Sequence, residues 1–289
     1  MNFGVRDRGK RGHGHDRITP MQEASNHAHI RIVQSRQNAR VKDLRAALKK
    51  SETTASGLVA VEGLHLVEEA LRSGLRVETV FVRSGSLGLL GGLRVADDAE
   101  VLELPADVFE SAVTTESPQG IAALVEAPAF SLEQVLSGAS PLVVVAAGLQ
   151  DPGNLGTIVR SAEAFGASGL VALPGTVSVW NAKALRASSG SAFRLPVVSA
   201  SEKELLEMLR SRRVRSLATV LDGGVAAQAV DLSGPVALFI GNEGSGLSAE
   251  LVNACDALVT IPCPGPVESL NAAIAASVLL YEASRQRGK

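Results

Sequence analysis

The amino-acid sequence predicts an α/β protein in two modules, of which the second is built on a mostly parallel sheet. The run "PLVVVAAGL" (141–149) is continuously apolar, which is typical of a strand buried on both faces. After this run, strand-like and helix-like segments alternate to the end of the chain, as in a parallel sheet covered by helices. A shorter set of such segments precedes it. The 289 residues are 46% hydrophobic, ample for two ordinary cores.

Composition and spacing divide the chain into four parts. The first residues are polar and lack periodicity, so we expect a disordered tail, with Met1 and Met21 as alternative starts. The segment "PAFSLEQVLSGASP" connects the two modules and has room for one short helix. The expected parts are a disordered basic tail (1–28), a smaller α/β module (29–127), a linker (128–140) and the second module (141–289).

The elements of the first module follow from periodicity. "NARVKDLRAALKK" (38–50) places Val41, Leu44, Ala47 and Leu48 at helical spacing. The helix that begins at 64 is closed by Gly74, a residue type common at helix ends. The remaining predicted elements are strands at 57–63, 77–83, 100–104 and 120–127 and a short helix in 105–110.

In the second module, helices and strands alternate. Ligands of open parallel sheets bind beyond the carboxyl ends of the strands, so the loops that follow the strands are the candidate binding site. The predicted helices are 154–166, about 180–189, 201–212, 247–254 and 268–286. The predicted strands after 141–149 are 169–173, 195–198, 214–221, 235–240 and 257–262.

Several protein classes are disfavoured. No apolar run approaches the ~18 residues of a membrane span, and the start has no apolar signal region, so we expect a soluble cytoplasmic protein. Cys255 and Cys263 form neither a disulfide framework nor a zinc spacing. Four histidines lie in or next to the tail without a ligand framework, so we expect no metal site there: His13, His15, His27 and His29.

One segment is strongly basic although the net charge is only −2. Between Arg31 and Lys50 seven basic residues are opposed only by Asp43. This segment predicts a contact with a polyanion; the alternative is a solvated helix face. The candidate RNA-binding residues are Arg36, Arg40, Lys42 and Arg45.

Three loops of the second module are rich in glycine and polar residues: "GLQDPGNLGTIVRSAEAFGA" (148–167), "LFIGNEGSGLS" (238–248) and "IPCPGPVESLNAAIAAS" (261–277). Their glycine spacing is not the dinucleotide fingerprint, and no lysine completes a P-loop. "ASSGSA" (187–192) suggests a serine hydrolase, but no histidine follows His65, so this module cannot build a Ser-His-Asp triad by itself. Any chemistry must therefore use Asn, Arg, Glu and Ser.

In order and spacing, these loops resemble the three motifs of the SpoU/TrmH branch of the SPOUT methyltransferases, over residues 141–286. The preceding residues, from "SRQNARVKDLRAALKK" to "GIAALVE", resemble the L30e-like substrate-binding domain of that branch. The resemblance implies a parallel sheet with a deep trefoil knot, S-adenosylmethionine as cofactor, a homodimer, and methyl transfer to a ribose 2′-hydroxyl of RNA.

The resemblance also implies the site residues, each of which has a structural alternative. Arg160 would act on the 2′-hydroxyl, or else form a surface pair with Glu163. Asn154 would place Arg160, or cap a helix; Glu243 would organise the loops, or be an exposed turn carboxylate. Ser269 and Asn271 would reach the reaction centre, or satisfy a helix N-terminus. The expected catalytic residues are Asn154, Arg160, Glu243, Ser269 and Asn271, and the expected cofactor-binding residues are Leu221, Gly241, Ile261 and Leu270.

The leading hypothesis is an S-adenosylmethionine-dependent RNA 2′-O-ribose methyltransferase acting on 23S rRNA. Alternatives are a tRNA methyltransferase, a non-catalytic RNA-binding protein of this fold, and an oxidoreductase, which lacks its fingerprint. Small residues after Asn271 (Ala272, Ala275 and Ala276) serve core packing or, by resemblance, the dimer interface. Cys263, where the family pattern has Met, and its neighbours Pro264 and Pro266 depart conservatively from that pattern.

Overall fold

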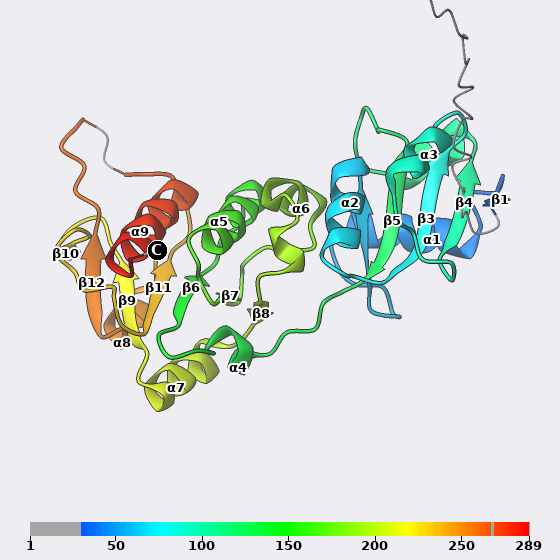
Figure 1. Cartoon of the computed structure of the whole chain (residues 1–289). Helices are drawn as coiled ribbons and strands as arrows, with labels where there is room; N and C mark the ends of the chain where they lie inside the picture. Colours follow the sequence, from blue (N-terminus) through cyan, green and yellow to red (C-terminus); the bar gives the residue numbers. More distant parts are fainter. Residues whose placement is uncertain (1–29, 267–268, 289) are drawn as a thin grey trace, which may run out of the picture.

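The computed structural model describes residues 30–266 and 269–288, which form two α/β domains joined by a linker (Figure 1). The predicted tail (1–28), with His13, His15 and His27, lies outside the described residues, as does His29. Within the described part of the chain, no helix is long and apolar enough to cross a membrane.

The first domain contains a mixed five-stranded sheet with the order β1-β4-β3-β5-β2. β3 pairs in parallel with β4 and antiparallel with β5. The strands are β1 Ile30–Ile32, β2 Leu58–Glu62, β3 Val77–Arg83, β4 Glu100–Leu104 and β5 Ile121–Glu126. The helices are α1 Ala39–Lys50, α2 Leu64–Arg72 and α3 Ala106–Ala112, with the 3-10 helix η1 at Leu87–Gly92.

The two faces of this sheet are covered by different helices. Phe81 of β3 packs in one apolar cluster with residues of α1 and α3, including Leu44 and Phe109. Val80 and Val82 point the other way, into a second cluster that holds Leu66 of α2. α2 therefore covers the face whose cluster continues into the second domain.

The second domain contains a seven-stranded sheet with the order β10-β12-β9-β11-β6-β7-β8. Every strand pair in it is parallel, as the continuous apolar run of β6 predicts. The strands are β6 Leu142–Ala146, β7 Gly169–Ala172, β8 Val197–Ser199, β9 Arg215–Thr219, β10 Val225–Ala226, β11 Val236–Ile240 and β12 Ala257–Thr260.

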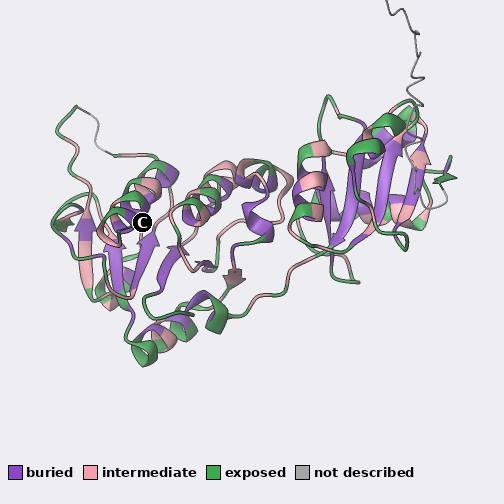
Figure 2. Cartoon of the chain, viewed as in Figure 1, coloured by how far each residue is buried: buried purple, intermediate pink, exposed green. Residues whose placement is uncertain are grey.

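Helices cover both faces of this buried sheet (Figure 2). α5 and α9 share one apolar cluster with Leu142 and Val144 of β6. α4, α7 and α8 share another with Val143 and Val145. The helices are α4 Leu132–Val135 in the linker, α5 Pro152–Ala164, α6 Ala182–Ser188, α7 Glu202–Arg212, α8 Ala249–Ala254 and α9 Ala272–Gln286, with η2 at Ser191–Phe193.

The structure corrects several predicted boundaries. α5 begins at Pro152, where proline is well suited to the first turn, and not at 154. α9 begins at Ala272, after the cap Asn271, and not at 268. Strands β1 and β10 were not predicted, because three and two residues carry no alternation that could be recognised.

Candidate active site

The loops after β6 and β11 meet at the carboxyl edge of the second sheet. β6 and β11 are neighbours in the sheet: β7 and β8 extend it on one side of β6, and β11 and β9 on the other side. Open α/β sheets bind their ligands at such a switch point. The side-chain amide of Asn242 donates to the carbonyl of Gly148 over 2.7 Å, which ties one loop to the other. The backbone N–H of Gln150 also points to the Glu243 carboxylate, 3.5 Å away.

Asn154 connects three segments that are far apart in the chain. Its Nδ2 donates to Oε1 of Glu243 over 2.9 Å. Its Oδ1 accepts from Nδ2 of Asn271 over 3.0 Å. The predicted convergence of the three loops thus exists as a hydrogen-bonded row, which we call the Asn271–Asn154–Glu243 row.

Asn154 is free for this row because another residue caps its helix. The N-cap of α5 is Asp151, whose Oδ1 accepts from the Asn154 backbone N–H over 2.8 Å. The interpretation of Asn154 as an N-cap is therefore wrong. The other oxygen of Asp151 binds Nζ of Lys183 at 2.8 Å. This bond, followed by the backbone N–H of Asn154, holds the pKa of Asp151 below its usual range.

Asn271 combines the two roles that were weighed as alternatives. It is the N-cap of α9, and its Oδ1 accepts from the backbone N–H groups of Ala273 and Ile274 at 2.9 and 3.3 Å. Its Nδ2 remains available and donates to Asn154. One amide therefore ends a helix and joins the row, since its oxygen and nitrogen face different partners.

Glu243 supplies the charge of the row. Burial disfavours its anion, but the hydrogen bonds from Asn154 and from backbone groups outweigh burial and lower its pKa. An ionised Glu243 can only accept hydrogen bonds, so it orients the Asn154 amide with Nδ2 toward Glu243 and Oδ1 toward Asn271. The geometry fits an organising residue.

Arg160 lies on the same helix but outside the row. Six residues separate it from Asn154, about 9 Å along the axis and on a different helix face. Its side chain is exposed and makes no ion pair with the described residues. The alternative pairing with Glu163 is wrong, because Arg194 holds both oxygens of that carboxylate at 2.7 and 3.0 Å.

Ser269 is the predicted site residue with the least structural support. It is exposed, follows residues 267–268 that lie outside the description, and makes no side-chain hydrogen bond with the described residues. The structure therefore does not bring Ser269 into the row, although Asn271 two residues later belongs to it.

The predicted cofactor residues follow three neighbouring strands. Leu221, Gly241 and Ile261 come after β9, β11 and β12, and Leu270 precedes Asn271. The Thr260 hydroxyl donates to the Leu221 carbonyl over 2.7 Å, joining two of these loops. A side chain at Gly241 would collide with the backbone of Gly246, so glycine is required in this loop.

One residue of this region was missed by sequence reasoning. Thr219 ends β9, two positions before Leu221, and its buried Oγ1 has no hydrogen-bond partner among the described residues. A buried hydroxyl normally finds a partner, so this atom is suited to a ligand. Leu221, two residues later, is 66% exposed. The signal was a polar residue in the apolar run "SLATV".

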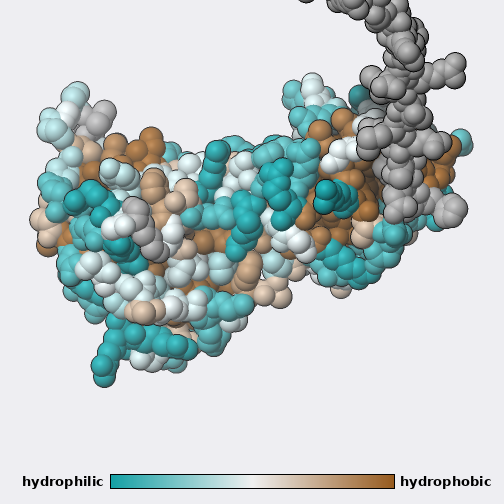
Figure 3. All heavy atoms as spheres, in the orientation of Figure 1, coloured by the Kyte–Doolittle hydropathy of each residue, from teal (hydrophilic) through white to brown (hydrophobic). Residues whose placement is uncertain are grey.

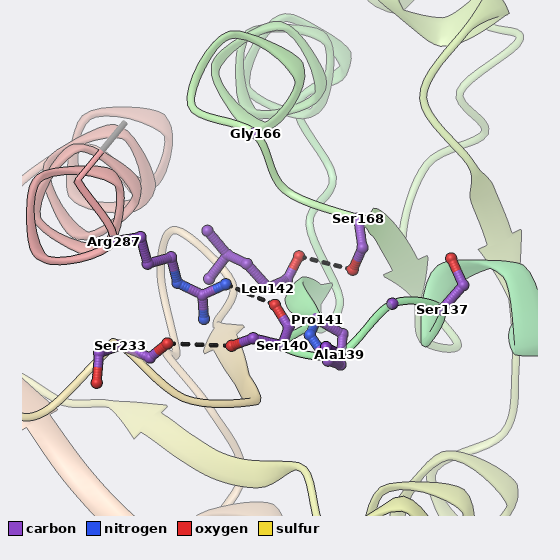
Figure 4. Close-up of a pocket in the computed structure, with 10 residues that line it drawn as sticks. Ser137, Ala139, Ser140, Pro141, Leu142, Gly166, Ser168, Ser233 and Arg287 are labelled. Atoms are coloured by element: carbon purple, nitrogen blue, oxygen red, sulfur yellow. Dashed lines mark hydrogen bonds between the residues drawn. The ribbon is translucent and has the colours of Figure 1, made fainter.

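A hollow of about 440 Å³ lies at the opposite edge of the sheet (Figure 4). It is found at the amino end of β6, where Arg287 donates to the carbonyls of Ser140 and Leu232 at 2.7 and 2.9 Å. Because the guanidinium is occupied by carbonyls, this hollow anchors the end of α9. We assign no ligand to it.

Two of the four predicted RNA-binding residues are paired with acids, and a third is bound to a serine. Arg36 pairs with Asp107 at 2.8 Å, and Arg40 with Glu78 and Glu100 at 2.5 and 3.5 Å. Arg45 donates to the backbone and hydroxyl oxygens of Ser111 at 2.9 and 3.0 Å. The charges of Arg36 and Arg40 are thus paired with acids from later strands and helices, which the segment alone does not show, and RNA binding by the three arginines stays a prediction. On α1, the exposed lysines without a partner among the described residues are Lys42, Lys49 and Lys50.

No group of three metal-ligating side chains occurs in the described residues. The row and the cofactor region consist of amides, one carboxylate, hydroxyls and backbone. This donor set suits the orientation of polar groups and a neutral nucleoside.

The Glu243 carboxylate makes Asn154→Asp a sharp test of the row. In the wild type the lowered pKa of Glu243 contributes stability above the unfolded value, and this is lost as pH falls. The substituted side chain would face Glu243 with a second carboxylate, so one pKa of the pair rises and stability is lost as pH rises. We expect the melting temperature of the variant to fall further below the wild type between about pH 5 and pH 8.

Asn154→Ala is the matched control, since it removes the same hydrogen bonds without adding charge. Its deficit should stay nearly constant over that pH range. Thermal melts of the three proteins that show the same pH trend for both variants would contradict the geometry of the row.

Comparison with known proteins identifies the family of the chain. Residues 141–281 match the SpoU rRNA Methylase family, and residues 38–123 match an MRM3-like substrate binding domain. The 23S rRNA (guanosine(2553)-2′-O)-methyltransferase RlmP of Bacillus subtilis is 36% identical over 256 residues, covering 87% of this chain and 98% of the relative. A 23S rRNA (uridine(2479)-2′-O)-methyltransferase of Streptomyces viridochromogenes is 34% identical, covering 86% and 91%.

Solved structures resemble the whole chain. The SpoU methyltransferase AviRb from Streptomyces viridochromogenes in complex with AdoMet superposes with a TM-score of 0.77 at 32% identity, covering 88% of this chain and 99% of the other. The AdoMet-bound rRNA methyltransferase from Sinorhizobium meliloti gives 0.78 at 33% identity, covering 89% and 98%. Since likeness extends over both domains and nearly the full length of these relatives, the chain belongs to the SpoU rRNA methylase family.

Proposed function

We propose that this protein transfers a methyl group from S-adenosylmethionine to a ribose 2′-hydroxyl of 23S rRNA. The observation that carries the proposal is the Asn271–Asn154–Glu243 row at the switch point of the parallel sheet. The relatives named above for this reaction are similar over both domains, which supports rRNA over tRNA and over a binding protein without activity.

The side chains suit a reaction that needs orientation more than acid or base strength. The cofactor supplies a reactive sulfonium methyl group, so the protein must position the ribose oxygen and exclude competing water. Asn271 and Asn154 offer amide groups whose directions are fixed by the helix cap and by Glu243. Arg160, left without a carboxylate among the described residues, is a cation that can orient a phosphate or stabilise negative charge near the hydroxyl.

For the cofactor we propose the region formed by Leu221, Gly241, Ile261 and Leu270, with Thr219 as an additional polar contact. The support is chemical: an adenine edge is neutral and pairs well with backbone donors and acceptors. The required Gly241 and the buried Thr219 hydroxyl, which has no partner in the described part of the chain, fit such a ligand. Arg160 is not needed for this binding.

We propose a homodimer formed through the outer face of α9. Ile274, Val278 and Tyr281 recur at helical spacing there and are 54%, 38% and 57% exposed. Apolar side chains gather over α9 in Figure 3. Of the earlier candidates for this interface, Ala272 and Ala276 are buried inside the chain, and Ala275 is half-buried. An exposed apolar stripe on one helix is suited to a symmetric contact.

We also propose that the first domain is L30e-like and that the second contains a trefoil knot. In support of the knot, β12 lies two strands from β11, yet Asn271, which follows β12 in the chain, contacts Asn154, whose side chain also binds Glu243 of the loop after β11. An experimental structure in which the 241–248 loop does not encircle the returning chain would contradict this.

Arg160→Ala should reduce methyl transfer to 23S rRNA by about 100-fold or more, as removal of a charge-stabilising group typically does. The affinity for S-adenosylmethionine should stay unchanged, since Arg160 lies outside the cofactor region. Labelled cofactor with purified rRNA measures the first, and calorimetry the second.

Two outcomes would contradict this proposal. If the wild type transfers no label to rRNA or to tRNA, the enzymatic function is wrong. If Arg160→Ala is as active as the wild type, the assignment of Arg160 is wrong. Transfer to tRNA alone would establish the alternative substrate.

The free lysines of α1 predict where RNA is held. Replacing Lys42, Lys49 and Lys50 by Glu should weaken rRNA binding. The slope of the logarithm of affinity against the logarithm of salt concentration should become shallower by about 2, because each lost phosphate contact contributes ~0.7–0.9 to this slope. The melting temperature should change little. Arg40→Glu is the contrasting variant: it breaks two ion pairs and should lower the melting temperature. Unaltered RNA affinity in the lysine variant would exclude this surface.

The dimer predicts the effect of charge on α9. Ile274→Asp combined with Tyr281→Asp should leave a folded monomer of 29.9 kDa in light scattering, whereas the wild type should have twice this mass. Leu87→Asp, at a 36% exposed apolar residue of the first domain, serves as the control and should remain dimeric. A dimeric double variant would exclude the proposed face.

A further inference from the structure

One guanidinium bridges the two domains. Arg194 follows η2 in the second domain, and its Nε and Nη2 donate to the two oxygens of Glu163 on α5 at 2.7 and 3.0 Å. Its Nη1 donates to Oε2 of Glu69, on α2 of the first domain, at 2.8 Å, and to Oγ of Ser73 at 3.1 Å. All three guanidinium nitrogens therefore donate hydrogen bonds: Nε and Nη2 to the second domain, and Nη1 to the first.

The carboxylate on the first domain is buried. Only 9% of the Glu69 side chain is exposed, and its second oxygen is bound by Arg72 at 2.6 Å. A buried carboxylate is costly unless both oxygens are paired, and here one pair comes from each domain. With Glu163, the two arginines and two glutamates form a neutral cluster. The cluster is neutral, and Arg194 binds one carboxylate of each domain. Both features favour one relative orientation of the domains.

The surrounding contacts agree with a built interface. The turn before Arg194 contains Gly190 with φ +87°, where a Cβ would lie 2.7 Å from Cβ of Glu69. Next to it, the Ser189 hydroxyl and Nε2 of His65 on α2 are 2.8 Å apart. At the other end, Nδ2 of Asn181 donates to the Ser51 hydroxyl over 3.0 Å. α2 and α6 accordingly lie side by side in Figure 1.

The motif "ASSGSA" thus acquires a role that its resemblance to a hydrolase turn did not suggest. Ser189 contacts His65, and Gly190 permits the close approach of Glu69. Domains joined by one linker move relative to each other unless an interface holds them. This turn and Arg194 add polar contacts to the apolar cluster that continues from one domain into the other.

Arg194 also determines what Arg160 can bind. Glu163 lies three residues after Arg160, the spacing at which opposite charges pair on a helix. Arg194 instead holds both Glu163 oxygens; burial disfavours that anion, but the bonds from Arg194 outweigh burial and keep its pKa low. Arg160 is thereby left without a carboxylate partner among the described residues.

We infer that Arg194 is a positioning residue with two effects. It locks the substrate domain against α5, so that RNA held by the first domain presents its ribose at a fixed place. It also withholds Glu163 from Arg160. The inference rests on the proposed function for its kinetic consequences, whereas the locked orientation is a property of the protein itself.

Arg194→Ala should raise the KM for rRNA about tenfold, because small misplacements of a substrate are costly. It should also lower kcat, because Glu163 is then free to pair with Arg160. The affinity for S-adenosylmethionine should be unchanged. Arg72→Ala is the matched control: Arg72 pairs with the same carboxylate but stays within the first domain, so both kinetic constants should remain near wild type. Arg194→Lys keeps a charge without the fork and should give the same changes to a smaller extent, with the fold preserved.

The two effects can be separated by a second substitution. Glu163→Gln added to Arg194→Ala removes the carboxylate that would capture Arg160. The double variant should regain kcat while KM for rRNA stays raised. If kcat of the double variant stays as low as that of Arg194→Ala, the second effect is overturned.

Small-angle X-ray scattering tests the locked orientation without reference to activity. Arg194→Ala should show a larger radius of gyration than the wild type, and Arg72→Ala should not. Equal scattering and equal KM for these two variants would overturn the inference even if the wild type methylates rRNA. If the wild type methylates no RNA, the proposed function fails, and scattering alone decides on the lock.

Discussion

The side chain of Asn154 is the contact on which the site depends. An amide has a donor end and an acceptor end, and here the two ends are occupied by loops that enter from different strands. An Asp in its place would repel Glu243, and a Ser would be too short to span both partners. The row exists because Asp151 takes over the cap of α5 and leaves this amide free. The arrangement of the loops after β6 and β11 and of the start of α9 follows from it.

Much of the architecture could be predicted from sequence, because long elements carry their own periodicity. The apolar run of β6 predicted a doubly covered parallel strand, and the spacing in α1 predicted its buried face. Helix starts were less accurate. In α5 and α9 the choice between several Asp, Asn and Ser residues as cap depends on which of them is needed elsewhere. Asp151 and Asn271 are the caps, whereas Asn154 is not.

The site was predictable in part. The resemblance of the three loops to family motifs identified Asn154, Glu243 and Asn271, and the structure joins them. Nothing in the local sequence could show that Arg36 faces Asp107 or that Arg40 faces Glu78 and Glu100, since those acids lie far along the chain. Charge counted within a segment overestimates the charge available to a partner. The buried hydroxyl of Thr219 likewise depends on packing between strands.

Pairing with acids within the fold also decides which cations are available to bind RNA. A guanidinium already bound by a carboxylate must break that pair before it can hold a phosphate, so paired arginines are poor candidates. In this protein acids of the first domain pair with Arg36 and Arg40, and Arg194 pairs with Glu163, three residues after Arg160. On α1 and α5, as far as the structure describes them, the cations without an acidic partner are the lysines of α1, Arg45, which is bound to Ser111, and Arg160. The lysines and Arg160 lie on the two domains that Arg194 and Glu69 connect, so this bridge fixes the distance between the proposed RNA-binding surface and the proposed reaction site.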